Sequence, residues 1–443
     1  MEVFSYFLLF EYIQTFIIIP FKISYPQNNL LNNEKYSITD FINDYMIRDF
    51  YTTIDIGTPP QKLFAIISPN SRAFSLSSEE FFPKNFESND EFELVSYKGY
   101  IPFFSSSFST IKNITFFSKK YKTRTIISES ILLYNENKEK TKIDDIKIIF
   151  EEDNKEQKYA IIGLNYDTSN KEVPYIVNEL KRLNIIKNYN WHFKFISKTE
   201  GQFIIGSLPH KYEKKNKLFK KNKYTNILTS SAGDYSYPWS IHFNQIYFLN
   251  NKNDKFIISQ ITKCTFTPNL GFIIGNTNYK KLILDNYFKD LIDNNICNLE
   301  KTEVTKFNKS FVYYGTFGIY EFFVCDKNKF VNEKINYKKQ FMPLLFDLPK
   351  YNYTFNLDEN DLFLELNDKY YFLVAFPENK NAFYYIHCFL GLPFYQKYRL
   401  TFNYDSKTIG FYNQYINSDD DEEEYMNDDG LKIDSKLNKY NYI

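Results

Sequence analysis

The sequence is poor in the residues from which most metal, redox and phosphate sites are built. Its 443 residues include 13 glycines, 4 cysteines and 4 histidines. It has no Cys-x-x-Cys pair, no His-x-x-x-His pair and no glycine-rich phosphate loop, so we expect no metal site and no cofactor. Lysine plus arginine and aspartate plus glutamate number 54 each. This balance gives no overall argument for nucleic-acid binding.

Long hydrophobic runs are also scarce. Only residues 1–25 contain an apolar stretch close to the length of a membrane span, which excludes a polytopic membrane protein. That stretch carries Glu2 and Glu11 and has no basic start, so it resembles an imperfect signal peptide or an uncleaved signal anchor. We therefore predict a protein of the secretory pathway that is secreted or held at a membrane by its first residues.

The charges are unevenly distributed along the chain. From Ser418 to the end there are nine acidic and three basic residues. A block of like charge repels itself and usually stays disordered, so residues 417–443 are predicted to form an acidic disordered tail. The alternative is a contact between this tail and the lysine-rich stretch 211–223.

Aromatic residues are abundant, with 39 tyrosines and 46 phenylalanines. Short runs of aromatic and β-branched residues alternate with Asn, Asp, Ser, Gly and Pro, which is typical of an all-β protein. Clearer helical patterns occur only at Val173–Leu183 and Asn286–Ile296. The predicted strands include Phe50–Ile56, Leu63–Ile67, Lys112–Phe117, Thr125–Leu133, Gln202–Ile205 and Leu400–Tyr404. A strand-rich chain of this length indicates two β-domains.

The two halves of the chain share a weak repeat. A hydroxyl-Pro-Asn triplet stands at residues 68–70 and again at 267–269. Each triplet is followed later by an apolar pair and a glycine, at residues 161–163 and 389–391. The same order of elements in both halves favours two similar substructures.

These elements and their flanks resemble the pepsin-like aspartic protease family, and in particular its plasmepsin-like members. The resemblance covers about Glu34 to Gln414, and its most specific part is residues 388–412 (CFLGLPFYQKYRLTFNYDSKTIGFY). Further matching segments are residues 51–61 (YTTIDIGTPPQ), 96–99 (SYKG), 159–166 (YAIIGLNY) and 202–207 (QFIIGS).

The resemblance implies an all-β, bilobal fold, with two β-barrel-like lobes around a central cleft and few short helices. On this basis residues 26–45 form a short pro-like segment, residues 46–210 the N-terminal lobe and residues 211–416 the C-terminal lobe. The remaining residues to which the resemblance gives a role are Tyr97 and Gly99 in a flap over the cleft, Gly163 and Gly391 as structural glycines, and Cys297 and Cys325 as a disulfide. Cys264 and Cys388 are then expected to be buried thiols.

The sequence departs from the family where the chemistry should be. Members carry Asp-Thr-Gly or Asp-Ser-Gly once in each lobe, and two carboxylates that share a proton act as the acid and the base. A serine or threonine hydroxyl is no base near neutral pH, so the match predicts no catalytic residues. The degenerate positions are Ser68, Pro69 and Asn70 in the first half and Thr267, Pro268 and Asn269 in the second.

We therefore predict a catalytically inactive homologue that acts as a binding or scaffold protein, with a peptide or protein partner in the cleft. One alternative is an active hydrolase with relocated catalytic groups, for example Ser68 or Thr267 activated by His387. Another is a structural or adhesive surface protein. An open cleft floor around the two hydroxyl residues would favour peptide binding, and a filled floor would favour the structural role.

Overall fold

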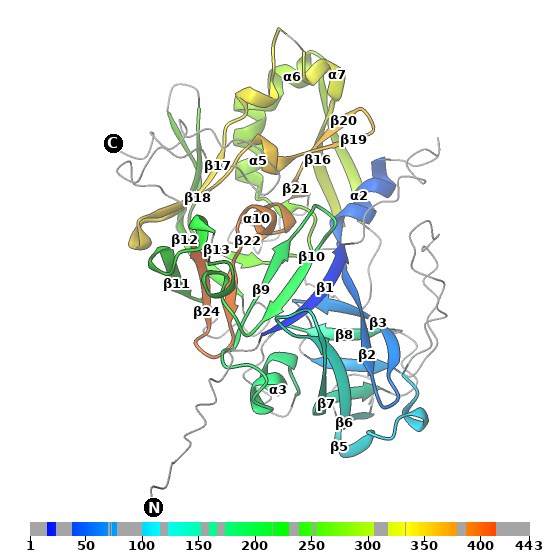
Figure 1. Ribbon diagram of the computed structural model, residues 1–443. Helices are drawn as coiled ribbons and strands as arrows, with labels where there is room; N and C mark the ends of the chain where they lie inside the picture. The colour runs from blue at the N-terminus through cyan, green and yellow to red at the C-terminus, as the bar shows by residue number, and fades with distance from the viewer. Residues whose placement is uncertain are drawn as a thin grey trace, which may run out of the picture.

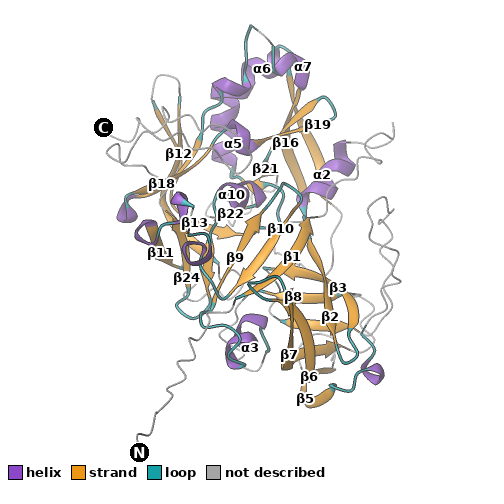
Figure 2. Ribbon diagram, viewed as in Figure 1, coloured by secondary structure: helices purple, strands orange, loops and turns teal. Residues whose placement is uncertain are grey.

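The computed structural model describes residues 16–23, 38–69, 71, 73–77, 100–115, 123–151, 159–165, 173–214, 216–229, 239–250, 254–304, 318–332, 334–378 and 387–412. Strands dominate these residues and the helices are short, which confirms the all-β prediction (Figure 2). The predicted acidic tail lies outside the described residues. None of the helices in the described ranges is long and apolar enough to cross a membrane.

One sheet of thirteen strands holds most of the first half of the chain. Its order is β11-β24-β23-β9-β10-β1-β2-β3-β8-β4-β7-β6-β5. The strands from the first half are β1 (Ile17–Ile23), β2 (Phe50–Ile56), β3 (Gln61–Ser68), β4 (Phe74–Ser77), β5 (Ser109–Thr115), β6 (Thr123–Tyr134), β7 (Lys140–Glu151), β8 (Ala160–Gly163), β9 (Asn190–Phe195) and β10 (Glu200–Ile205). The strands that the second half adds are β11 (Tyr224–Leu228), β23 (Thr401–Asn403) and β24 (Thr408–Tyr412).

A second sheet holds the rest of the second half. Its order is β18-β17-β12-β13-β22-β14-β21-β16-β20-β19, with β15 paired to β16. Its strands are β12 (Ser240–Leu249), β13 (Lys255–Phe266), β14 (Ile273–Ile274), β15 (Cys297–Val304), β16 (Gly318–Asp326), β17 (Leu344–Leu348), β18 (Tyr353–Leu357), β19 (Phe363–Leu366), β20 (Lys369–Phe372), β21 (Val374–Pro377) and β22 (His387–Leu390). In Figure 1 strands β16, β19, β20 and β21 of the second sheet lie in the upper part of the molecule, and strands β2, β3, β5, β6, β7 and β8 of the first sheet lie at the lower right. The other labelled strands of the first sheet, β11, β24, β9, β10 and β1, lie between them.

Short helices connect the strands of the two sheets. They are α2 (Ile38–Met46), α3 (Ile176–Arg182), α4 (Pro209–Tyr212), α5 (Thr277–Ile283), α6 (Lys289–Asp293), α7 (Lys327–Phe330), α8 (Glu359–Leu362) and α10 (Leu392–Lys397). The shorter 3-10 or π turns are η1 (Pro102–Phe104), η2 (Lys217–Phe219), η3 (Lys221–Lys223), η4 (Leu284–Phe288), η5 (Lys338–Gln340) and η6 (Pro349–Tyr351). Both predicted helical segments are confirmed, the first by α3 and the second by η4 with α6.

The predicted internal repeat is present in the strand pairing. In the first half β3 pairs with β8 in parallel, β8 with β4 antiparallel, and β4 with β7 in parallel. In the second half β13, β22, β14 and β21 repeat the same three pairings in the same order. Each half therefore contains one copy of a mixed parallel and antiparallel unit.

The segment predicted as a signal peptide or anchor contains a strand of the folded body. Strand β1 pairs with β10 from Ile17↔Ile205 to Lys22↔Glu200. Alternate residues of β1, Ile17, Ile19, Phe21 and Ile23, are buried in the core, and this burial stabilises the strand. Residues 17–23 therefore belong to the fold in this structure, and their role in targeting stays a prediction.

The predicted disulfide is confirmed. The sulfur atoms of Cys297 and Cys325 are bonded, and the two residues are direct partners in the antiparallel pairing of β15 with β16. The other two cysteines are free: Cys264 is buried, as expected, whereas Cys388 is only half-buried.

Candidate functional site

The first hydroxyl-Pro unit lies at the end of β3, beside β8. Ser68 is the register partner of Gly163, and the Leu164 N–H donates to the Ser68 carbonyl oxygen at 2.9 Å. The Ser68 Oγ accepts a hydrogen bond from the Ser71 N–H at 3.0 Å. Ser68 has no exposed surface and Pro69 is buried as well. The Ser68 hydroxyl therefore serves to fix its own loop. Asn70, Tyr97 and Gly99 lie outside the described residues.

The second unit lies at the equivalent end of β13. The Thr267 N–H donates to the Leu390 carbonyl at 2.9 Å, and the Leu270 N–H donates to the Thr267 carbonyl at 3.0 Å. Thr267 has no exposed surface, and its hydroxyl has no hydrogen-bond partner among the described residues. Pro268 and Asn269 are buried beside it. We call residues 267–271 the second loop.

The two framework glycines are sites of close backbone approach. A Cβ atom on Gly163 would lie 2.4 Å from the Ala73 carbonyl oxygen. A Cβ atom on Gly391 would lie 2.1 Å from the Phe272 carbonyl oxygen. Such distances leave no room for a side chain, so both positions need glycine for steric reasons. We call the segments that begin at Gly163 and Gly391 the first and second closing loops.

Neither of these two units, residues 68–70 and 267–269, contains an aspartate or a glutamate. A buried serine and a buried threonine hydroxyl cannot act as an acid and base pair near neutral pH. The backbone of His387 pairs with Lys263, four residues before Thr267 on the same strand. At about 3.3 Å per residue that places the His387 backbone about 13 Å from the level of Thr267. The structure therefore does not bring these two residues together along the strand.

The second loop is covered by residues 46–48, which directly follow the predicted pro-like segment and begin the predicted N-terminal lobe. The Gly271 N–H donates to the Met46 carbonyl at 3.1 Å, and the Arg48 N–H donates to the Asn269 carbonyl at 2.7 Å. Ile47 forms an antiparallel bridge with Leu270. Residues 46–48 therefore run alongside the second loop as a short extra strand.

Helix α2 extends this cover over the second lobe. Phe41 and Tyr45 are buried, at 1% and 5% exposed, in a cluster with residues of β14, β16 and β20. The ring of Tyr45 lies 5.3 Å from that of Phe272, and the ring of Phe41 lies 4.2 Å from that of Tyr371. Figure 1 shows α2 beside β16, far along the chain from it. Phe41 and Tyr45 of α2 therefore pack on the sheet of the second half, with Tyr45 directly against Gly271 of the second loop.

Arg48, whose backbone N–H donates to the second loop, has a buried charged side chain that was not predicted from the sequence. Its side chain is 1% exposed, and its guanidinium carbon lies 4.8 Å from the centre of the Tyr45 ring. Contact with an aromatic face offsets part of the cost of burying a guanidinium.

Trp239 forms hydrogen bonds to both halves of the chain. Its indole Nε1–H donates to the Leu164 carbonyl at 3.0 Å, and its own carbonyl accepts the Phe266 N–H at 2.8 Å. The closing loop of the first half is thereby fixed to the strand that leads into Thr267.

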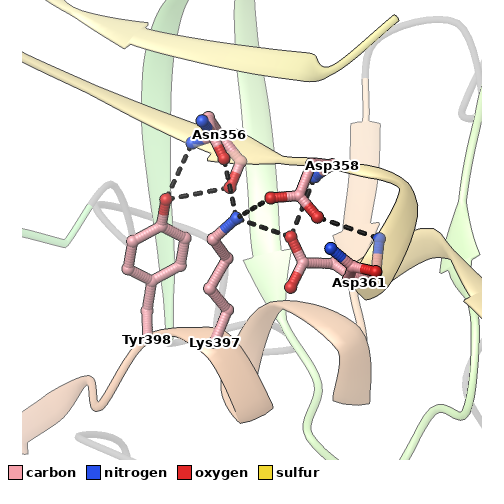
Figure 3. A network of polar contacts seen from close by, with 6 residues as sticks. Asn356, Asp358, Asp361, Lys397 and Tyr398 are labelled. Atoms are coloured by element: carbon pink, nitrogen blue, oxygen red, sulfur yellow. Dashed lines mark hydrogen bonds and ion pairs between the residues drawn. The ribbon is translucent and has the colours of Figure 1, made fainter. Parts of the chain in front are cut away.

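A polar network holds α10, the helix that follows Gly391 (Figure 3). The Lys397 Nζ donates to Asp361 Oδ2 at 2.6 Å, Asp358 Oδ2 at 3.0 Å and Asn356 Oδ1 at 2.7 Å. The Tyr398 hydroxyl accepts the Asn356 N–H at 2.8 Å and donates to the Asn356 carbonyl at 2.9 Å. These contacts join α10 to β18 and α8. Because α10 directly follows Gly391, they also hold the second closing loop in place.

Burial and the neighbouring charges shift the pKa values of Lys397, Asp358 and Asp361. Burial alone would lower the pKa of Lys397, but Asp361 and Asp358 outweigh it and raise that pKa. Burial alone would raise the pKa of Asp358, but Lys397 outweighs it and lowers that pKa. For Asp361, burial prevails over Lys397 and raises the pKa to about 6.

Asp361 should give the stability of the fold a pH dependence of its own. Its folded-state pKa of about 6 exceeds the ordinary 3.8, so its contribution to stability is fully present below about pH 4 and lost as the pH rises toward 6. Asp361→Asn does not titrate. We therefore expect its free energy of unfolding to fall less than that of the wild type over this range. Urea denaturation at several pH values measures the difference, and parallel curves for the two proteins would contradict it.

The buried Thr267 hydroxyl should be dispensable. Because it has no partner among the described residues, Thr267→Val removes only an unpaired polar group and should be neutral or stabilising by up to about 1 kcal/mol. The matched control is Thr401→Val, since the Thr401 hydroxyl is 2.6 Å from the Tyr224 hydroxyl and is also buried. That variant should lose about 1 kcal/mol in chemical denaturation. Equal losses in both variants would show that Thr267 has a partner.

Comparison with known proteins supports the fold. No family model and no curated protein matches the sequence. Among solved structures, the chain is similar to basic 7S globulin from soybean, with a TM-score of 0.52 at 8% sequence identity. The match covers 90% of this chain and 94% of that one. Together with the repeated strand units, it shows that the chain has an all-β, bilobal, pepsin-like fold.

Proposed function

We propose that this protein is a catalytically inactive, pepsin-like protein that acts by binding, as a peptide- or protein-binding scaffold of the secretory pathway. One observation carries the proposal: at the two equivalent strand ends, where a pepsin-like enzyme needs carboxylates, the chain has fully buried Ser68 and Thr267. Loss of both the acid and the base removes general acid–base assistance, which is typically worth about 10²–10⁴ in rate. The fold match to basic 7S globulin from soybean supports the pepsin-like fold on which this proposal is built.

The location is part of the proposal. A closed disulfide between Cys297 and Cys325 fits an oxidising compartment, and the apolar N-terminal residues fit targeting to it.

The covered second loop limits how a partner can bind. Phe41 and Tyr45 pack on the sheet of the second half beside this loop, so a ligand in that place would have to displace α2. This cover also favours a second candidate, a structural or adhesive surface protein that makes no use of the cleft.

Peptide hydrolysis tests the loss of catalysis. The full chain is incubated with a broad peptide library from about pH 3 to 7, beside an active aspartic protease and the double variant Ser68→Ala/Thr267→Ala. We expect no turnover by either form of this protein. Turnover by the full chain that the double variant abolishes would overturn the proposal.

Equilibrium binding separates the scaffold from the structural role. Fluorescently labelled extended peptides are titrated with the full chain and with Phe41→Ala, which weakens the packing of α2. If the protein is a scaffold that binds peptides in the cleft, Phe41→Ala should bind the peptides more tightly than the wild type, because α2 is then easier to displace. Absence of binding by both proteins would favour the structural role.

A further inference from the structure

Cys264 and Cys388 lie opposite each other on two neighbouring parallel strands. They are direct Cα partners in the pairing of β13 with β22. Partner side chains on adjacent strands leave the sheet on the same face. The usual strand spacing of about 4.8 Å lies within the Cα–Cα range in which disulfides form.

The two thiols differ in access to solvent. Cys264 is fully buried, and Cys388 is half-buried. Burial raises the pKa of the Cys264 thiol, and a hydrogen bond with the Cys388 thiol raises it further. Burial raises the pKa of the Tyr279 phenol, and Cys388 raises it further. A dissolved oxidant can therefore reach the Cys388 thiol first. The Cys264 thiol, which is buried, can react only with Cys388.

We propose that Cys264 and Cys388 form a second disulfide site, which closes by exchange with a small disulfide such as oxidised glutathione. The Cys388 thiolate attacks one sulfur of the glutathione disulfide, which forms a mixed disulfide and releases one glutathione thiolate. The Cys264 thiolate then attacks the Cys388 sulfur, which forms the protein disulfide and releases the second glutathione thiolate. The two protein thiols lose two protons and are oxidised, and one glutathione disulfide is reduced to two thiols.

The position of the pair gives the bond a consequence beyond the proposed function. Strand β13 leads directly into Thr267, and β22 leads directly into Gly391. A bond between them would tie together the two strands that carry the second loop and its closing loop. The proposal is independent of which partner, if any, the protein binds.

Mass spectrometry of the native full chain tests the proposal. The folded protein is incubated with excess oxidised glutathione, its remaining thiols are alkylated, and the intact mass and the linked peptides are measured. We expect all molecules to lose two hydrogen atoms, to take up no alkylating agent, and to yield a peptide pair joined through Cys264 and Cys388. The bond between Cys297 and Cys325 should be found intact, which serves as the check of folding.

Two variants identify the order of the steps. In Cys264→Ser the second step is impossible, so one glutathione should stay attached to Cys388. In Cys388→Ser the remaining thiol is buried, so little or no glutathione should be attached. The proposal is overturned if the native wild-type chain keeps two alkylatable thiols, or if it stops with glutathione on Cys388.

Discussion

Replacement of Phe41 by alanine is expected to lower the free energy of unfolding by about 3–5 kcal/mol, as for other fully buried phenylalanines. Phe41 is 1% exposed and packs within 4.2 Å, ring centre to ring centre, of Tyr371. Its removal would leave a cavity between α2 and the sheet of the second lobe. Chemical denaturation of the full chain measures the loss.

The same change at Phe103 is the matched control. Phe103 lies in η1 and is 96% exposed, so Phe103→Ala removes almost no buried surface. We expect its denaturation midpoint to equal that of the wild type. If Phe41→Ala behaves like Phe103→Ala, α2 is not packed on the second lobe.

Replacement of Lys397 by methionine is expected to cost about 2–4 kcal/mol, between the values for exposed and for fully buried ion pairs. The Lys397 side chain is 21% exposed, and those of its partners Asp358 and Asp361 are 26% and 16% exposed. Methionine keeps the apolar stem but leaves two carboxylates close together without their cation. The cost should therefore be greatest above about pH 6, where Asp361 is ionised.

An exposed lysine gives the comparison for this change. Lys142 pairs with Asp144, and the two side chains are 49% and 65% exposed. Lys142→Met should leave the denaturation midpoint unchanged, because exposed pairs add little to stability. Equal midpoints for Lys397→Met and the wild type would show that the network supports α10 little.

Much of the fold could be predicted from local pattern. The prediction for Phe50–Ile56, made from its run of aromatic and β-branched residues, matches β2 residue for residue. In the structure this strand alternates buried and half-buried positions. The repeat of residues 68–70 and 267–269 was visible because equivalent strand ends carry equivalent residues. The pairing of Cys297 with Cys325 followed from the family resemblance, and the structure confirms it.

The contacts that cover the site could not be predicted in this way. An apolar run such as residues 17–23 has the same composition in a signal peptide as in a buried strand. The partner of Phe41 is Tyr371, and the partners of Lys397 include Asn356 and Asp358, so these contacts join distant parts of the sequence. No local spacing encodes such pairs. The apolar positions of α2 do indicate one buried face, but not the surface that covers it.

Hydrogen–deuterium exchange of the native full chain tests the covered second loop most directly. The amides of Gly271 and Arg48 donate to the Met46 and Asn269 carbonyls, at 3.1 and 2.7 Å, and should therefore exchange slowly. The reference is the Asn137 amide in the exposed turn between β6 and β7, which donates to the side-chain oxygen of Asn135 and should exchange faster because it is exposed to water. In Phe41→Ala the exchange of Gly271 and Arg48 should become faster. Exchange of these two amides in the wild type as fast as that of Asn137 would contradict a loop covered by the chain's own N-terminal segment.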